Sequence, residues 1–307
     1  MRRLRFALEA LGLILAVGIV RLLPPESASN LGGFVGRTVG PRLRVTRRAE
    51  RNLRLALPDT PEAHVARIIR GMWDNLGRVL AEYPHLRRIT APDSGRVVWV
   101  DMEPVRALRD QKKPGILASA HLANWEIMPV AAAQYGLDMT IIVREPNNPF
   151  VRSMLDRLRR VAGGGRTPKG KSGAKEAIAV LGAGRVLGLL FDQKLNEGIP
   201  VPLFGVEAMT PTAPAQLALR FRCPLVPVRI ERTGPARFRV TSHAPLELPD
   251  SGDRQADVAR AMRELNRILE DWIRARPEEW LWLHRRWPEA AYGRLRADSP
   301  VPAEARR

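Results

Sequence analysis

Short apolar segments alternate with longer mixed segments through the last two thirds of the chain. The apolar segments predict buried strands at Gly115–Ala120, Met139–Val143, Val186–Phe191, Leu225–Ile230 and Phe238–Thr241. The segments between and after them predict helices at Ile127–Ala133, Pro149–Val161, Ala174–Leu181 and Asp253–Arg274. Because strands alternate with helices, we expect an α/β layered domain over residues 95–290.

The part of the chain before residue 95 has a helical pattern instead. Apolar side chains at three- and four-residue spacing predict a helix through Ile68, Met72, Leu76 and Leu80. We therefore assign residues 26–94 to a helical N-terminal region. The last residues, 291–307, form a polar tail, which we expect to be disordered from Arg296 onward.

The N-terminus combines basic and apolar residues in the order of a signal peptide. Arginines at positions 2, 3 and 5 precede an apolar stretch from Ala10 to Val20, but no small-residue cleavage site follows. The stretch is also shorter than the ~20 residues of a spanning helix. We expect residues 1–25 to form an uncleaved anchor in the inner (cytoplasmic) membrane, with flanking arginines keeping the body on the cytoplasmic side. An ordinary buried helix is the alternative.

The overall charge indicates acidic partners. The 307 residues include 50 Lys and Arg against 32 Asp and Glu, a net charge of +18. Anionic lipid, an acidic protein and nucleic acid all fit, although a GC-rich genome also enriches arginine. Basic stretches are not interleaved with aromatic residues, which disfavours nucleic acid. Cys223 is the single cysteine, so the chain has no internal disulfide and no cysteine metal cluster.

The segment His121–Glu126 is the strongest candidate for chemistry. His121 follows a predicted buried strand, where α/β folds place reacting groups. With Glu126 in the next helical turn, its carboxylate can accept a hydrogen bond from one ring nitrogen and leave the other as a base. The spacing alone is weak evidence, since His284 and Glu289 share it, and a structural histidine is the alternative.

Two other motifs are incomplete. Gly165–Ser172 matches the phosphate-binding loop pattern, but a basic helix precedes it where the pattern requires a strand. Gly170–Gly173 is one residue short of the nucleophile elbow of serine hydrolases. Neither motif predicts its usual function, and a nucleotide-binding ATPase remains a minor alternative.

Further motifs follow in order along the chain. They are Arg51–Pro58, Asn75–Arg78, Glu82, His121–Glu126, Arg144–Pro149, Asp192–Gln193, Val201–Gly205, Thr210–Pro211 and, most specifically, Pro277–Trp287. Together they resemble the late acyltransferases of bacterial lipid A biosynthesis and the related phosphatidylinositol mannoside acyltransferases. The resemblance runs through nearly the whole chain.

This resemblance implies a glycerolipid-acyltransferase-like α/β fold with an N-terminal membrane-anchoring helix. The implied reaction is direct O-acyl transfer from an acyl thioester, of acyl carrier protein or coenzyme A, to a lipid hydroxyl, without a covalent acyl-enzyme. His121 would deprotonate the hydroxyl, Glu126 would orient and charge His121, and Arg144 would stabilise the developing oxyanion. The substrate-binding candidates are Asn148, Asp192, Gln193, Arg285 and Arg286.

Simpler roles are open for these substrate-binding candidates. Asn148 would equally cap a helix, Asp192 a strand end, and the arginine pair would form a solvated basic face. The implied partners are acyl carrier protein, an anionic glycolipid acceptor and the membrane surface, with no nucleic acid. Such a transfer needs no metal and no redox cofactor. A non-catalytic membrane-binding protein with the same fold is the alternative from another class.

Overall fold

The computed structural model describes residue 12 and residues 17–143, 165–168 and 171–293. Most of the predicted anchor, the helix predicted at Pro149–Val161, the candidates Arg144 and Asn148, and the end of the tail lie outside these residues. None of the described helices is both long enough and apolar enough to cross a membrane.

A seven-stranded sheet forms the centre of the molecule, in the order β1-β9-β8-β2-β5-β3-β4. All neighbouring strands are parallel except the β8–β9 pair, which is antiparallel. The strands are β1 (Val97–Val100), β2 (Gly115–Ser119), β3 (Met139–Val143), β4 (Gly165–Pro168), β5 (Val186–Leu190), β8 (Leu225–Gly234) and β9 (Arg237–Ser242). The mostly parallel sheet confirms the predicted α/β class.

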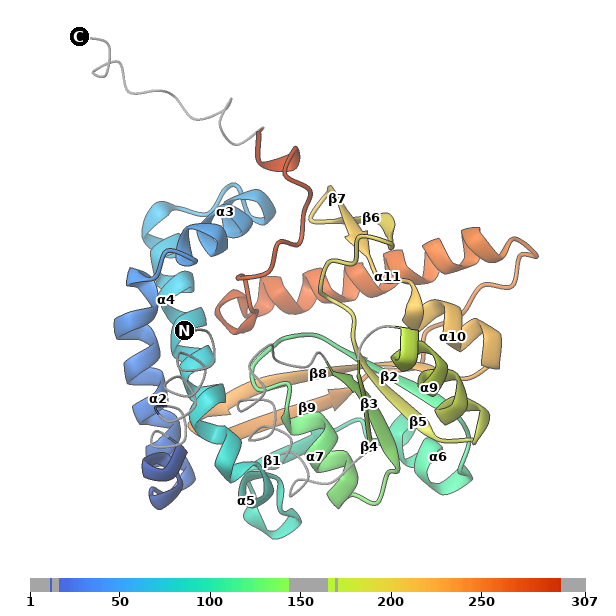
Figure 1. Ribbon diagram of the computed structural model, residues 1–307, viewed down its shortest axis with the longest axis horizontal. Helices are drawn as coiled ribbons and strands as arrows, with labels where there is room; N and C mark the ends of the chain where they lie inside the picture. The colour runs from blue at the N-terminus through green and yellow to red at the C-terminus, as the bar shows by residue number, and fades with distance from the viewer. Residues whose placement is uncertain (1–11, 13–16, 144–164, 169–170, 294–307) are drawn as a thin grey trace, which may run out of the picture.

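Helices cover both faces of the sheet (Figure 1). On one face lies α11 (Arg254–Ala275), with α9 (Lys171–Gly182) and α10 (Ala213–Phe221) beside it. On the other face lie α5 (Leu86–Thr90), α6 (Glu103–Gln111) and α7 (Ile127–Gln134). A separate hairpin of β6 (Ile199–Leu203) and β7 (Val206–Thr210) sits above α11.

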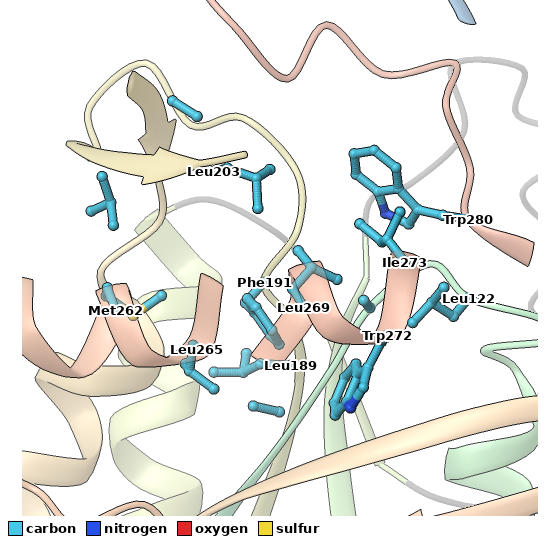
Figure 2. Packing of buried hydrophobic residues seen from close by; sticks show 14 of the residues in the cluster. Leu122, Leu189, Phe191, Leu203, Met262, Leu265, Leu269, Trp272, Ile273 and Trp280 are labelled. Atoms are coloured by element: carbon cyan, nitrogen blue, oxygen red, sulfur yellow. The ribbon is translucent and has the colours of Figure 1, made fainter. Parts of the chain in front are cut away.

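The alternation of side chains along β2 produces two apolar cores. Ile116 and Ala118 belong to the core under α11, whereas Leu117 belongs to the core under α7. Figure 2 shows the first core, in which Leu265 and Leu269 of α11 pack with Leu189 and Phe191 from the end of β5. Because both faces are buried, β2 and β5 consist of nearly continuous apolar residues, which is why their sequence predicted them.

The helical N-terminal region shares this first core. Its three longer helices are α2 (Pro25–Val39), α3 (Thr46–Ala56) and α4 (Glu62–Glu82). Ala49 and Leu53 of α3 and Met72 of α4 are buried in the same cluster as Trp280 and Trp287 near the C-terminus. The N-terminal helices and the last part of the chain therefore support one another.

Most predicted elements are present at nearly the predicted residues, but several elements were not predicted. The unpredicted ones are β1, β4, α6, α10 and the β6–β7 hairpin. β1 and β4 are the two edge strands of the sheet, each four residues long. In β1 the side chains are half-buried or exposed, so this strand does not have the continuous apolar character of a central strand.

Glycines allow α2 and α4 to touch backbone to backbone. A Cβ atom added to Gly77 of α4 would lie 2.1 Å from the carbonyl oxygen of Gly32 on α2. A Cβ atom on Gly36 would lie 2.1 Å from the carbonyl oxygen of Trp73. These distances are too short for any side chain, so the helix pair requires glycine at these positions.

We expect Gly77→Ala to lower the free energy of unfolding by about 1–3 kcal/mol, because the new methyl group meets backbone that cannot move alone. Gly182→Ala in α9 is the control, since its nearest neighbour would be 3.9 Å away. Urea unfolding of both variants measures the difference. Equal stability of the two variants would contradict the close packing of α2 and α4.

Candidate active site

His121 lies in a turn that follows the central strand β2. This histidine turn (Ala120–Glu126) connects β2 to α7 and includes Ala123 at φ 47°, in the left-handed region. A C-terminal segment fixes the turn from outside: Ala123 N–H donates to Glu279 O at 3.1 Å, and Leu281 N–H donates to His121 O at 3.1 Å. The turn is thus held by residues about 160 positions further along the chain.

Asp192 is the hydrogen-bond partner of the His121 ring. It follows β5, which runs parallel to β2, so both residues emerge at the same edge of the sheet. Its Oδ1 lies 2.8 Å from His121 Nδ1, and its Oδ2 accepts from His121 N–H at 3.0 Å and from Trp280 Nε1–H at 2.9 Å. These contacts fix both the position and the orientation of the imidazole.

The environment of Asp192 favours its ionised form. Burial by itself would raise the pKa of this carboxyl, which is only 1% exposed. Attraction to His121 and the hydrogen bonds from His121 and Trp280 outweigh that effect and hold the pKa of Asp192 well below its ordinary range. An ionised Asp192 accepts a hydrogen bond from Nδ1–H, so Nε2 keeps its lone pair.

Gln193 occupies the other side of the ring. Its Nε2 lies 3.0 Å from His121 Nε2 and 3.1 Å from His284 Nε2, so one amide bridges two imidazoles. The rings of Trp125 and His284 lie 5.0 and 5.2 Å from that of His121, centre to centre. The His121 side chain retains 12% exposure, and the residue lines a cavity rather than being sealed in the core.

The predicted hydrogen bond between His121 and Glu126 is wrong for this structure. Among the described residues, the two ring nitrogens of His121 face Asp192 and Gln193. Glu126 lies in the wall of the same cavity, 7% exposed, with its own N–H donating to Asn124 Oδ1 at 3.2 Å. His121 and Glu126 do line the same cavity, as their spacing predicted. The hydrogen-bond partner of the His121 ring is nevertheless Asp192, because β2 and β5 are neighbours in the sheet. A catalytic role for Glu126 stays a prediction.

A cavity of about 820 Å³ opens beside His121. Its described wall is mostly apolar, and comes from β3, β5, α7, α9 and α10. Besides His121 and Gln193, the wall includes Trp125, Met128, Ile142, Ile178, Leu189, Phe191 and Leu217. The cavity therefore offers a long apolar group a place next to a polar reacting centre.

A second buried carboxylate supports the histidine turn from behind. Glu82, at the end of α4, is fully buried and accepts hydrogen bonds from Ser29 Oγ at 2.7 Å and Asn124 Nδ2 at 2.8 Å. Arg232 of β8 also contacts Glu82, with Nη2 at 3.0 Å and a salt bridge from Nη1, and Ala236 N–H donates to Glu82 at 3.3 Å. Glu82 thus ties α2, β8 and the turn together. Glu82 is one of the ordered sequence motifs, but its role could not be predicted, because no local pattern links it to Asn124.

Arg286 is buried instead of reaching substrate. It is fully buried, its Nη1 donates to Met209 O at 2.9 Å and its Nη2 to Thr210 Oγ1 at 2.8 Å. Burial lowers the pKa of its guanidinium to about 10. The prediction that Arg286 grips a phosphate is therefore wrong: this side chain anchors the β6–β7 hairpin. Arg285 is exposed, and its role stays a prediction.

Of the remaining predictions, two concern residues outside the described part of the chain and one is contradicted by the structure. Arg144 and Asn148 lie outside the described residues, so their roles stay predictions. The possible phosphate-binding loop is excluded, because its first four residues form β4, paired with β3, and α9 begins at Lys171. A phosphate-binding loop follows its strand and does not include it.

Comparison with known proteins defines the class. The family model described as bacterial lipid A biosynthesis acyltransferase matches residues 1–289. The chain belongs to this family and is an acyltransferase, as its motifs predicted. Among its relatives is the lipid A biosynthesis lauroyltransferase of Escherichia coli (strain K12). The two are 27% identical over 301 residues, which cover 89% of this chain and 90% of the relative.

The carboxyl group of Glu279, whose backbone holds the histidine turn, should make the stability of the fold depend on pH. Burial raises the pKa of Glu279 to about 7, although Arg276 lies 3.1 Å away. The folded state therefore binds a proton that the unfolded state releases above pH ~4.5, and stability should fall as the pH rises from ~4.5 to ~7. We expect Glu279→Gln to remove this part of the pH dependence, as measured by urea unfolding at several pH values.

The half-buried neighbour Glu278 provides the control. Glu278→Gln removes a carboxylate from the same 3-10 turn, η4 (Pro277–Glu279), whose negative charge adds to the raised pKa of Glu279. This variant should narrow the pH range of the slope without removing it. If Glu279→Gln keeps the wild-type slope, burial does not raise the pKa of Glu279 as described.

Proposed function

We propose that the protein transfers a fatty acyl chain from the thioester of acyl carrier protein to a hydroxyl of a lipid A precursor, with His121 as general base. The observation that carries this proposal is the His121–Asp192 pair at the wall of an apolar cavity of about 820 Å³. Membership of the lipid A acyltransferase family supports the acceptor class, and the named activity of the E. coli relative supports a fatty acyl donor.

The hydrogen bonds around His121 support its role as the base. Asp192 accepts a hydrogen bond from Nδ1–H, so Nε2 has the lone pair that can accept a proton. In the resting arrangement Nε2 faces the Gln193 amide. We infer that the acceptor hydroxyl takes the place of this amide at Nε2. The ionised Asp192 then stabilises the imidazolium that forms when His121 accepts the hydroxyl proton.

The reaction balances with these groups alone. The hydroxyl oxygen forms a bond to the thioester carbonyl carbon while its proton moves to His121 Nε2. The tetrahedral intermediate collapses, the carbon–sulfur bond breaks, and the leaving thiolate takes the proton from the imidazolium. The intermediate has a negative oxygen that requires a donor. The displaced Gln193 amide is one candidate, and Arg144 stays the predicted cation.

The cavity fits the acyl chain because its described wall is mostly apolar and it begins at the reacting histidine. The net charge of +18 favours an acidic carrier protein as donor and an anionic acceptor. Leu31, Phe34 and Val35 form an exposed apolar stripe on α2, each 41–56% exposed. Such a stripe supports attachment to the cytoplasmic face of the inner membrane, which we propose as the location.

Two other functions are distinguished from the proposed one by an acyl-transfer assay. A phosphatidylinositol mannoside acyltransferase would use the same base with another acceptor. A non-catalytic membrane-binding protein would not depend on His121. Coenzyme A would replace acyl carrier protein as donor without any change at the site.

Acyl transfer by the detergent-solubilised protein tests the proposal, with labelled acyl carrier protein thioester and a panel of lipid acceptors. We expect His121→Ala and Asp192→Asn each to reduce the rate by about 10²–10⁴-fold, because one removes the base and the other its orienting charge. Glu126→Ala tests the role predicted from sequence.

Lys171→Ala is the matched control and should retain full activity, since residues 165–172 do not form a phosphate-binding loop. Wild-type activity of His121→Ala would disprove the mechanism. Transfer only to phosphatidylinositol mannoside would replace the proposed acceptor.

The cavity also predicts which chains are transferred. Ile178 of α9 lines the cavity and is half-buried. Ile178→Trp should fill part of the space and shift the preference toward shorter acyl chains by about tenfold or more, since each buried CH₂ contributes ≈ 0.8 kcal/mol. Competition between thioesters of different lengths measures the shift, and an unchanged preference would place the acyl chain elsewhere.

A further inference from the structure

A second cleft, separate from the His121 cavity, is lined by an unusual number of arginines. It encloses about 480 Å³ between α4, the β8–β9 turn and η4, and shares no described lining residue with the first cavity. Six arginines line this arginine cleft: Arg37, Arg67, Arg70, Arg78, Arg232 and Arg276. Three carboxyl groups, of Asp74, Glu278 and Glu279, face them, so the positive charges exceed the negative ones by at least three.

Four of the arginines already have carboxylate partners. Asp74 is shared by Arg37 at 2.7 Å and Arg78 at 2.5 Å. Arg232 pairs with the buried Glu82, and Arg276 lies 3.1 Å from Glu279. The acids of the cleft are therefore used mainly by arginines whose positions they fix.

Arg67 and Arg70 differ from the other four. Both are exposed on α4, and within the described part of the chain neither side chain makes a hydrogen bond or an ion pair. They are three residues apart on a helix, so they lie on the same side and repel each other. An anion between them would relieve this repulsion, and two guanidinium groups match the oxygen geometry of a phosphate.

Gly71 keeps the cleft narrow beside these two arginines. A Cβ atom at this position would lie 2.7 Å from Glu278 Cβ, so the absence of a side chain lets η4 approach α4. The next turn of α4 presents Asn75, whose Nδ2 donates to Ala123 O at 2.9 Å. The inner wall of the cleft is thus the support of the histidine turn.

We propose that the arginine cleft binds a phosphate group, held by Arg67 and Arg70. The volume exceeds what one phosphate needs and leaves room for the group that carries it. That carrier is either the acceptor glycolipid or an anionic phospholipid of the surrounding membrane. Phosphate binding here does not depend on the transfer reaction, so the site goes beyond the proposed function.

Calorimetric titration of the detergent-solubilised full chain with glycerol 3-phosphate at low ionic strength tests the site. We expect saturable binding by the wild type and at least a tenfold weaker Kd for Arg67→Gln/Arg70→Gln. Arg260→Gln/Arg263→Gln is the matched control. It removes two exposed arginines at the same spacing from α11, outside the cleft, and should bind as the wild type does. Thermal unfolding checks that both variants fold.

No saturable binding by the wild type, equal binding by the Arg67/Arg70 variant, or the same loss in the control would each overturn the proposal. None of these results depends on acyl transfer, so failure of the site and failure of the proposed function are distinguishable.

Two further measurements identify the carrier. If the acceptor supplies the phosphate, the Arg67/Arg70 variant raises KM for the phosphorylated acceptor with kcat unchanged, and has no effect with a dephosphorylated one. This comparison rests on the proposed function. If the phospholipid supplies it, the variant sediments less with phosphatidylcholine vesicles containing phosphatidic acid, relative to the control variant. Loss of glycerol 3-phosphate binding with neither effect assigns the cleft to a soluble phosphate compound.

Discussion

The carboxylate of Asp192 joins three parts of the chain that are far apart in sequence. It accepts hydrogen bonds from the backbone and ring of His121, after β2, and from Trp280, near the C-terminus. A buried carboxylate without such partners would cost several kcal/mol, so the ends of β2 and β5 and the C-terminal segment must come together in one arrangement. The same contacts set the tautomer of His121, which means that one interaction serves both the fold and the chemistry.

Glu82 also joins distant parts of the chain, on the other side of the histidine turn. It connects α2 through Ser29, the turn through Asn124 and the β8–β9 ribbon through Arg232. The N-terminal helices are therefore part of the support of the active site. The glycine contacts between α2 and α4 also support the active site, because they determine where α4, and with it Glu82, lies.

The two cavities separate two kinds of chemistry. The larger one is mostly apolar and has His121 in its wall, whereas the smaller one is lined by arginines and lies against Asn75 and Glu279. These two residues also hold Ala123 in the histidine turn. A lipid with both acyl and phosphate groups matches this separation, and the charge of +18 is partly concentrated in the arginine cleft.

The sequence by itself determined the α/β class, the central strands and the position of His121 at a strand end, because burial on both faces leaves a local apolar pattern. Its ordered motifs also determined the family. Only the tertiary structure decided that Asp192, 71 residues away, orients the ring in place of Glu126, and that Arg286 is buried under the hairpin. Local patterns record whether a residue is buried, but the partner of a buried polar group is decided by which strands become neighbours in the sheet. For the same reason, no pattern indicated that Arg67 and Arg70 would face the β8–β9 turn across a cleft.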